Sequence, residues 1–280
     1  MAVTVPRGVL AQYYRFSLYN SPFAAHDEGC AIDLYPEGDR APAPVAGEVL
    51  DTKTVRAPPK AYAAEHDYLM LVDTGDHVAR LLHVKPAVEA GERVAVGDDL
   101  GALVRAGFFA PWVPNHIHLG FRAPDANPYR AAGSLPVEAG VEVEPLAWDG
   151  TGTVVDTGET WARLDSPTHP APGERFVGLA AGDGGGESVA GAGVLDGGLP
   201  HYDWGGLLGG ESGTARLAGR RVGVADGRTV AWDDVTVLAN GDPVTGVALF
   251  CSRDEAGVKL VGEGVDLAVG ESVTVSVSRD

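Results

Sequence analysis

The sequence predicts a mostly-β protein of two domains, and three observations lead to this prediction. The chain has 280 residues, which is enough for two ordinary domains. Its 39 glycines and 19 prolines divide the apolar residues into short runs, a pattern typical of many strands joined by turns. No apolar run approaches the ~18 residues that a membrane-spanning helix needs. Since residues 1–8 also lack the apolar core of a secretory signal, we expect a soluble, cytoplasmic protein with no membrane partner.

The charge of the chain argues against one class of partner. The formal net charge is −18, from 39 acidic and 21 basic residues. Because this charge would repel the phosphates of nucleic acid, we expect no nucleic-acid partner. An acidic, lysine-poor chain rich in alanine, valine and glycine resembles the proteins of a salt-loving archaeon. An acidic protein of a high-GC bacterium has a similar composition, and both sources stay open.

The first domain is expected at residues 1–133 and consists of strands and turns. Aromatic residues alternate in its first segment, which fits a strand packed on the domain. Later apolar segments end at proline, glycine or a short polar turn, as strands do. The expected strands and hairpin elements lie at residues 13–19, 30–35, 44–50, 68–73, 78–84, 88–101 and 115–122.

The second domain is expected at residues 134–280, with its first strand at 137–144. Apolar and polar residues alternate clearly toward the end of the chain, which predicts an antiparallel, β-sandwich-like accessory domain. The alternating segments are residues 230–238, 246–250, 258–261 and 273–277. The glycine-dense stretch 181–213 is expected to form loops with little regular structure.

Two histidines two residues apart, His116 and His118, lie in the last strand expected in the first domain. Residues i and i+2 of a strand project from the same face, so both imidazoles share one face. Upstream, Asp33 interrupts an apolar strand, and a carboxylate is costly to bury unless a positive group pairs with it. His26 precedes that strand, and His83 lies at the end of a hairpin strand.

The order of these motifs resembles that of the lysostaphin-type (LytM-like) zinc endopeptidases. A histidine and an aspartate are followed by an apolar-His-apolar strand and then by His-x-His. Residues 43–49, Ala-Pro-Val-Ala-Gly-Glu-Val, look like the family's "pV.A..dG.V" strand, and residues 88–101 look like its "V..G..V..G..IG" hairpin. The resemblance covers roughly residues 23–123 and implies a barrel-sandwich hybrid fold for the first domain.

Carried over residue by residue, the resemblance implies that His26, Asp33 and His118 bind zinc. It also implies that His83 and His116 handle the water and the transition state. Two histidines and one carboxylate leave a fourth zinc position open for water, as a catalytic site requires. Zinc lowers the pKa of such a water toward ~7, so a neutral imidazole could serve as its base. The expected function is a zinc-dependent hydrolase, an endopeptidase acting on a peptide or a peptide-containing glycan.

A function of another class is also open, namely a non-catalytic binding module, metal-stabilised or metal-free, that reuses the same fold. The presence of all five polar residues favours the enzyme. Residues 108–114, Phe-Phe-Ala-Pro-Trp-Val-Pro, favour the module. They put bulky apolar groups where the family has a small polar loop, so they would narrow, reshape or cover the substrate groove.

The remaining polar residues of interest are expected to be structural. Asp27 and Glu28 are expected in a solvated turn, although either could replace Asp33 as a ligand if Asp33 points away. Residues 201–204, His-Tyr-Asp-Trp among glycines, form either a carbohydrate-contacting loop or an aromatic anchor. The histidines expected to have no role in the site are His66, His77, His169 and His201.

Overall fold

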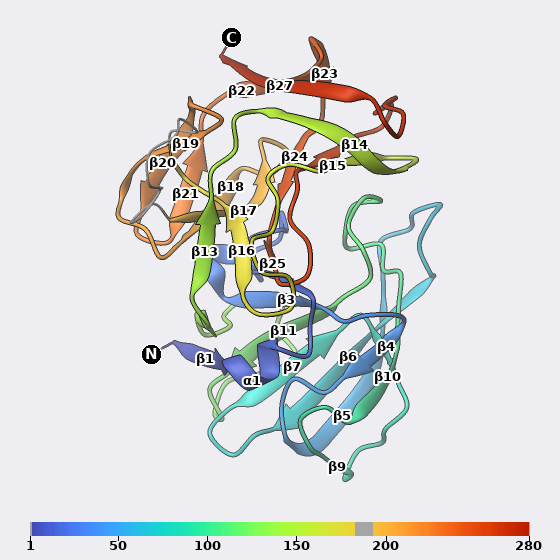
Figure 1. The fold of residues 1–280 in the computed structure, drawn as a ribbon. Helices are drawn as coiled ribbons and strands as arrows, with labels where there is room; N and C mark the ends of the chain where they lie inside the picture. Colours follow the sequence, from blue (N-terminus) through green and yellow to red (C-terminus); the bar gives the residue numbers. More distant parts are fainter. Residues whose placement is uncertain (1, 183–192, 280) are drawn as a thin grey trace. The chain divides into compact units, whose positions relative to one another are not determined.

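The chain folds almost entirely into β-strands, in a computed structural model that describes residues 2–182 and 193–279 (Figure 1). It forms two compact units. Unit 1 comprises Met1–Leu18 and Phe23–Val141, and unit 2 comprises Tyr19–Pro22 and Glu142–Asp280. The predicted mostly-β, two-domain fold is confirmed.

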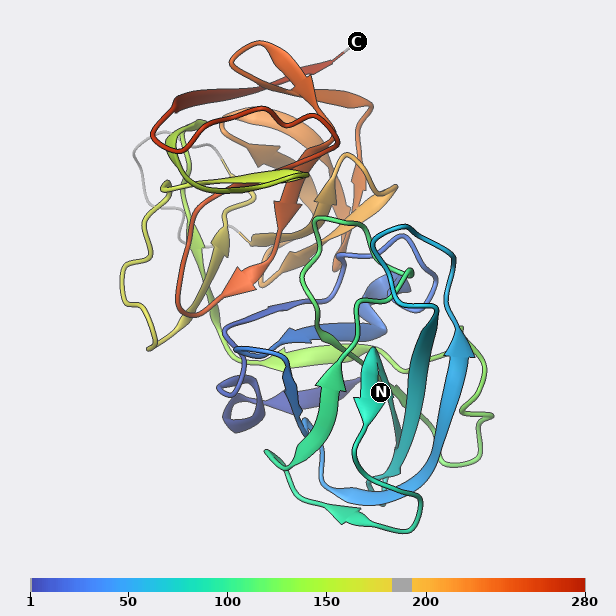
Figure 2. The same ribbon diagram turned by 90° about the vertical axis from the view of Figure 1, so that its right-hand side faces the viewer.

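Unit 1 contains short strands, one short helix and one 3-10 turn. Its elements are β1 (Val3–Pro6), α1 (Arg7–Leu10), β2 (Arg15–Ser17), η1 (Asp27–Gly29), β3 (Ala31–Tyr35), β4 (Arg40–Pro42), β5 (Gly47–Arg56), β6 (His66–Asp73), β7 (Val78–Leu82), β8 (Val84–Pro86), β9 (Arg93–Val94), β10 (Asp99–Leu103), β11 (Ile117–Arg122) and β12 (Val137–Gly140). Its main sheet has the strand order β2-β3-β11-β7-β6-β5-β9, and β4, β10 and β8 form a small second sheet. The two long strands β5 and β6 run side by side in both ribbon views (Figures 1 and 2).

The main sheet of unit 1 has an apolar face and a polar face, and both are buried around β11. Ile117, Leu119 and Phe121 of β11 are 0–5% exposed and belong to the core. The alternate residues of β11 project from the opposite face. There His118 stands directly opposite Asp33 of β3 in the antiparallel register. Since β11 lies between β3 and β7, the polar face places their side chains beside those of β11.

The boundary between the units differs from the predicted one at 133/134. The strand expected at residues 137–144 in the second domain is two strands, β12 and β13. Strand β12 pairs in parallel with β1, so it belongs to unit 1. The prediction was wrong here because the alternation of residues does not reveal which neighbour a strand pairs with.

Gly101 in β10 faces the backbone of the neighbouring strand β8. Its φ is +137°, and a Cβ there would overlap the carbonyl of Lys85, a backbone group that cannot move aside cheaply. We expect Gly101→Ala to lower the free energy of unfolding by about 2–4 kcal/mol, measured by denaturant titration. Gly8→Ala in α1 meets open space and serves as control, with an expected change below about 1 kcal/mol. Equal losses in the two variants would contradict the prediction.

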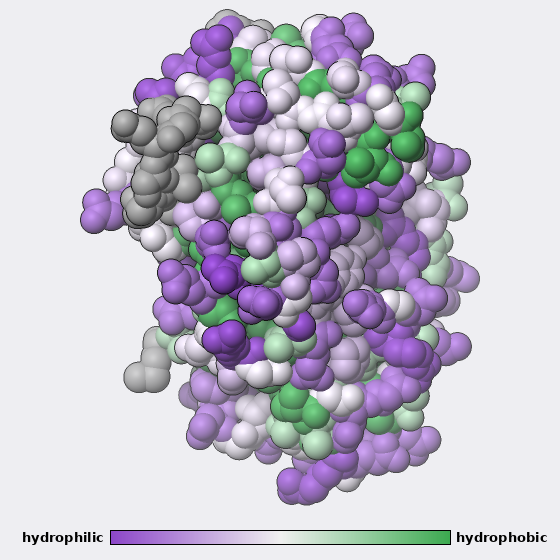
Figure 3. All heavy atoms as spheres, viewed as in Figure 1, coloured by the Kyte–Doolittle hydropathy of each residue, from purple (hydrophilic) through white to green (hydrophobic). Residues whose placement is uncertain are grey.

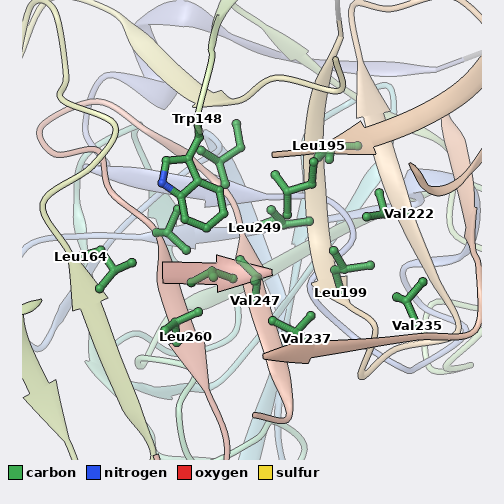
Figure 4. Packing of buried hydrophobic residues seen from close by; sticks show 14 of the residues in the cluster. Trp148, Leu164, Leu195, Leu199, Val222, Val235, Val237, Val247, Leu249 and Leu260 are labelled. Atoms are coloured by element: carbon green, nitrogen blue, oxygen red, sulfur yellow. The ribbon is translucent and has the colours of Figure 1, made fainter. Parts of the chain in front are cut away.

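Unit 2 also consists of strands. They are β13 (Val143–Leu146), β14 (Thr151–Gly158), β15 (Trp161–Leu164), β16 (Phe176–Leu179), β17 (Val194–Leu199), β18 (Trp204–Leu208), β19 (Gly213–Leu217), β20 (Arg220–Asp226), β21 (Thr229–Trp232), β22 (Val235–Ala239), β23 (Asp242–Val244), β24 (Gly246–Leu249), β25 (Cys251–Ser252), β26 (Lys259–Val261) and β27 (Ser272–Arg279). Twelve of them form one sheet in the order β19-β20-β21-β18-β17-β24-β26-β15-β14-β27-β22-β23. Aliphatic side chains from these strands, together with Trp148, form its buried core (Figure 4).

The glycine-dense stretch 181–213 was predicted to be loops, and for its described part this was wrong. Strands β17 and β18 lie within it, while residues 183–192 fall outside the described part. The glycines have a packing role there. A Cβ at Gly205 would overlap the indole of Trp232, and one at Gly206 would overlap the ring of Tyr19. In these strands, glycine allows bulky aromatic rings to lie against the backbone.

The surface of the described residues is mainly polar. On the face seen in Figure 3, hydrophilic residues predominate and apolar residues form small separate patches. Single exposed apolar side chains of this kind are ordinary for a folded protein. Among the helices of the described ranges, none is long and apolar enough to cross a membrane.

Candidate metal centre

Three residues of unit 1 bring their potential ligand atoms together. His118 Nδ1 lies 3.0 Å from His26 Nε2 and 3.1 Å from Asp33 Oδ1. His26 Nε2 lies 3.3 Å from the same carboxylate oxygen. All three side chains are buried, and together they could hold a metal ion. These are the three residues expected from the sequence to bind a metal.

The position of His26 is fixed by the backbone on both sides of it. Its Nδ1 lies 2.8 Å from the carbonyl oxygen of Leu18, which can only accept a hydrogen bond. In the neutral ring Nδ1 therefore carries the proton, and Nε2 presents a lone pair. Directly after His26 comes η1, where Glu28 and Gly29 have φ of +55° and +69°. This tight turn leads the chain from His26 into β3.

A proton or a metal ion would relieve the crowding of lone pairs in this group. Neutral His26 Nε2 and the Asp33 carboxylate oxygen both accept hydrogen bonds, yet they face each other at 3.3 Å in a buried site. Two such atoms repel unless a proton or a metal ion lies between them. Burial raises the pKa of Asp33, but attraction to His26 and His116 in their protonated forms, together with hydrogen bonds with His118 and His26, outweighs it and holds this pKa well below its ordinary value. The carboxylate is thus ionised and suited to bind a cation.

His83 is held next to this group by Asp67, a residue that the sequence analysis missed. His83 Nδ1 lies 2.6 Å from Asp67 Oδ2, and the His83 backbone N–H donates to Asp67 Oδ1 at 3.1 Å. His83 has φ of +68°, a conformation that few residues other than glycine adopt. With Asp67 fully buried, the imidazole has one orientation. The sequence signal for Asp67 is weaker than that for Asp33, because Asp67 precedes an apolar run whereas Asp33 interrupts one.

His116 completes the group of five. Its Nδ1 lies 2.9 Å from the carbonyl oxygen of Pro114, so Nδ1 carries the proton of the neutral ring. Its Nε2 points toward Asp33 Oδ2 at 3.5 Å. The rings of His83 and His116 lie 5.0 Å apart between centroids. The structure therefore brings all five predicted site residues together, three at the candidate metal position and two beside it.

The loop before His116 covers the imidazoles, as the bulky residues in it suggested. The Phe109 ring lies 4.6 Å from the His116 ring and 5.2 Å from the His83 ring, between centroids. The Phe108 ring lies 6.2 Å from that of His83. All five site residues are 2–7% exposed. The site is thus shielded from solvent by the aromatic side chains of this loop.

Arg105 holds the loop in this position. Its guanidinium donates to the carbonyl oxygens of Ala110 at 3.1 Å and Pro111 at 2.6 Å, and also to that of Val113. The same guanidinium lies 4.8 Å from the centroid of the Phe109 ring, in the range of a cation–π contact. The loop is therefore folded around one guanidinium group, that of Arg105.

The remaining candidates lie outside the group. Neither Asp27 nor Glu28 belongs to it, because Asp33 points into the site rather than away. His66 is exposed at the start of β6. In unit 2, His201 lies against Tyr202 with ring centroids 4.5 Å apart, and burial lowers the pKa of His201 to about 4. Such packing inside the unit is what an aromatic anchor requires.

The buried imidazoles predict an acid-sensitive fold when no metal is bound. Burial lowers the pKa values of His116 and His118 from 6.5 to about 4. Between pH 6.5 and 4 these histidines bind protons in the unfolded chain but not in the folded chain. The contribution of the two neutral imidazoles to the free energy of unfolding is therefore complete above pH 6.5 and is lost as the pH falls toward 4. We expect the melting temperature in EDTA to fall between pH 6.5 and 4.5. The same curve for His66→Gln is the control, and a flat wild-type curve would refute the prediction.

Comparison with known families gives two matches, one for each part of the chain. Residues 4–139 match the N-terminal domain of DUF8155, and residues 144–278 match its C-terminal domain; both are described as domains of unknown function. Neither a search of curated proteins nor a search of solved structures gave a match. The metal group described above lies entirely within the N-terminal match.

Proposed function

We propose that this chain, which belongs to the DUF8155 family and carries both of its domains, is a zinc-dependent hydrolase of peptide bonds. One observation carries the proposal. The atoms His26 Nε2, Asp33 Oδ1 and His118 Nδ1 lie 3.0–3.3 Å apart in pairs. Ligands ~2.0–2.1 Å from a tetrahedral zinc ion lie roughly 3.3 Å from one another.

The donor set fits zinc in kind as well as in spacing. Two imidazole nitrogens and one carboxylate oxygen are ordinary zinc ligands, and three protein ligands are typical of catalytic zinc sites. When bound, zinc supplies a Lewis acid and lowers the pKa of a coordinated water. Structural zinc sites are usually closed by a fourth protein ligand, which this group lacks among the described residues.

The two further histidines give the site groups that can move protons. Because Asp67 and the Pro114 carbonyl occupy the Nδ1 atoms of His83 and His116, the neutral rings present Nε2 as the basic atom. In the proposed reaction, Nε2 of His116 takes a proton from water and returns it to the leaving amine. His83, with both ring nitrogens protonated and Nδ1 donating to Asp67, would donate from Nε2 to the carbonyl oxygen of the substrate. General base catalysis of this kind contributes about 10²–10⁴-fold to a rate.

The substrate class rests on the resemblance of residues 23–123 to the lysostaphin-type endopeptidases. It is a peptide, free or attached to a glycan, with small residues at the cleaved bond. A substrate reaches the imidazoles only when Phe108 and Phe109 move, since these rings cover them. Closure of this loop over a bound peptide would also exclude water from the site.

The burial of the site favours a second candidate function, a metal-stabilised binding module without catalysis. In that case the metal joins β3, β11 and the segment before η1, and the aromatic loop is a permanent part of the core. The two candidates differ in one observable. A module needs the metal for folding only, whereas a hydrolase also turns over a substrate.

The test is hydrolysis by the full chain loaded with zinc. Purified protein is stripped with EDTA, reloaded with one equivalent of zinc, and incubated with a library of glycine- and alanine-rich peptides, with products identified by mass spectrometry. Cleavage that disappears in EDTA and returns with zinc supports the hydrolase. One bound zinc, raised thermal stability and no cleavage of any peptide identify the module. Absence of zinc binding rejects both.

A further inference from the structure

Two arginines are buried on the polar face of the main sheet of unit 1. Arg80 in β7 is 4% exposed and Arg122 in β11 is 1% exposed. In the antiparallel register Arg80 lies opposite Gly120, and Arg122 lies opposite Val78. Directly opposed residues share a face, and Gly120 and Arg122 alternate with the core residues of β11. Both guanidinium groups therefore project from the face that carries His118.

Neither guanidinium has a carboxylate partner among the described residues. Arg122 donates to two backbone carbonyls, those of Arg130 at 2.6 Å and Ala131 at 3.4 Å. The Nε atoms of Arg80 and Arg122 are buried and have no hydrogen-bond partner. Burial, together with the positive charge of Arg122, lowers the pKa of Arg80 to about 10. Two arginine cations on one buried strand face, without a carboxylate partner, repel each other, and an anion beside them offsets that repulsion.

A third buried polar group without a partner lies over β11, between the strand positions of His118 and Arg122. The buried Oγ of Ser134 makes no hydrogen bond in the structure. It stands over Gly120, 3.0 Å from the position that a Cβ of this residue would take. Gly120 is the residue opposite Arg80, so Ser134 Oγ lies over the strand position that pairs with Arg80. Residues 131–133, next to Ser134, are exposed, so only a thin layer of chain covers the group.

We infer that Arg80, Arg122 and Ser134 form a binding site for a small monovalent anion, either a halide ion or a carboxylate. The two Nε–H groups and the Ser134 hydroxyl are donors, and the anion supplies the acceptor and the negative charge that they lack. The site does not depend on the proposed hydrolase function. Gly120 is two residues from His118 on the same strand face, so a bound peptide carboxylate would lie beside the metal group.

The experiment measures anion binding by thermal stability in the full chain without metal. The melting temperature is followed at pH 7.5 in EDTA and the sodium salt of MES, a bulky sulfonate that is neither a halide nor a carboxylate, while sodium bromide replaces this salt at constant ionic strength. We expect a saturable rise of about 3 °C in the wild type, because an anion that binds only the folded state stabilises it. Titration with N-acetylglycine in the presence of bromide separates the two sources. A higher apparent Kd for bromide identifies a site open to peptide carboxylates, and an unchanged Kd identifies a halide site.

Matched variants show whether the response comes from this group. Arg80→Met removes one buried charge, and we expect it to abolish the bromide response while raising the melting temperature in the bromide-free MES salt. Arg56→Met removes the charge of an exposed arginine in β5 and should keep the full response. Equal responses of Arg80→Met and the wild type, or no wild-type response, overturn the inference. If Arg80→Met does not fold, crystals of the wild type are soaked in bromide. Anomalous density within hydrogen-bond distance of Arg80 and Arg122 supports the inference, and the absence of such density overturns it.

Discussion

His118→Ala is expected to weaken zinc binding by about 10³-fold or more, while His116→Ala is expected to retain one zinc ion per chain. The two histidines are two residues apart, yet their contacts differ. His118 Nδ1 lies within 3.1 Å of both other candidate ligand atoms. His116 Nε2 lies 3.5 Å from Asp33 Oδ2, which is not the carboxylate oxygen of the candidate metal position. Removal of such a neighbour costs roughly 10-fold to 100-fold in metal affinity, far less than removal of a ligand.

Metal affinity is measured by competition with a chelating dye, and stoichiometry by elemental analysis after dialysis. Asp33→Asn provides a further comparison, because it keeps the size of the ligand and removes its charge. We expect Asp33→Asn to behave like His118→Ala. Loss of zinc from His116→Ala together with retention in His118→Ala would reverse the assigned roles and contradict the geometry.

The second large effect concerns turnover. We expect His83→Ala and His116→Ala each to lower kcat by about 10²–10⁴-fold with zinc still bound, as for removal of a general acid or base. Asp67→Asn should lower kcat less, because its amide still accepts a hydrogen bond from His83 but no longer carries a charge. The measurement is steady-state hydrolysis of the best peptide found with the wild type.

His66→Ala is the control for turnover, because His66 is exposed and lies next to Asp67 without belonging to the group. It should leave kcat unchanged within about twofold. A fall in kcat equal to that of His83→Ala would mean that changes in β6 act through folding and not through the imidazole. Unchanged kcat in His116→Ala would remove this residue from the proposed mechanism.

Local patterns in the sequence drew attention to Asp33, His116 and His118, and the resemblance to the lysostaphin-type family implied that His26 and His83 join them. Asp33 is a charge inside an apolar strand, and His116 and His118 have the spacing of one strand face. The structure places all of them in one group with His26 and His83. The strand patterns alone do not show which strands are neighbours in the sheet. That these residues converge was implied by the order of the motifs in the resemblance.

Other features could not be predicted because they depend on backbone groups or on pairing between distant strands. The Arg105 contacts are to carbonyl oxygens, which every residue has. The pairing of β1 with β12, which moves the end of unit 1, leaves no trace in the alternation of residues. The glycines in β17 and β18 suggested loops, because the sequence does not show which glycines form turns and which lie in strands against an aromatic ring.

The contacts of Arg105 also bear on the speed of any reaction in this site. The Arg105 guanidinium binds three carbonyl oxygens of residues 110–113. The backbone that carries Phe109 therefore moves away from the imidazoles only when several of these hydrogen bonds break together. Motions of this kind take microseconds to milliseconds or longer. Opening of the loop, and not bond cleavage, would then set the pace of turnover. Peptides and chemically activated esters would in that case be hydrolysed at similar maximal rates, and solvent viscosity would slow both alike.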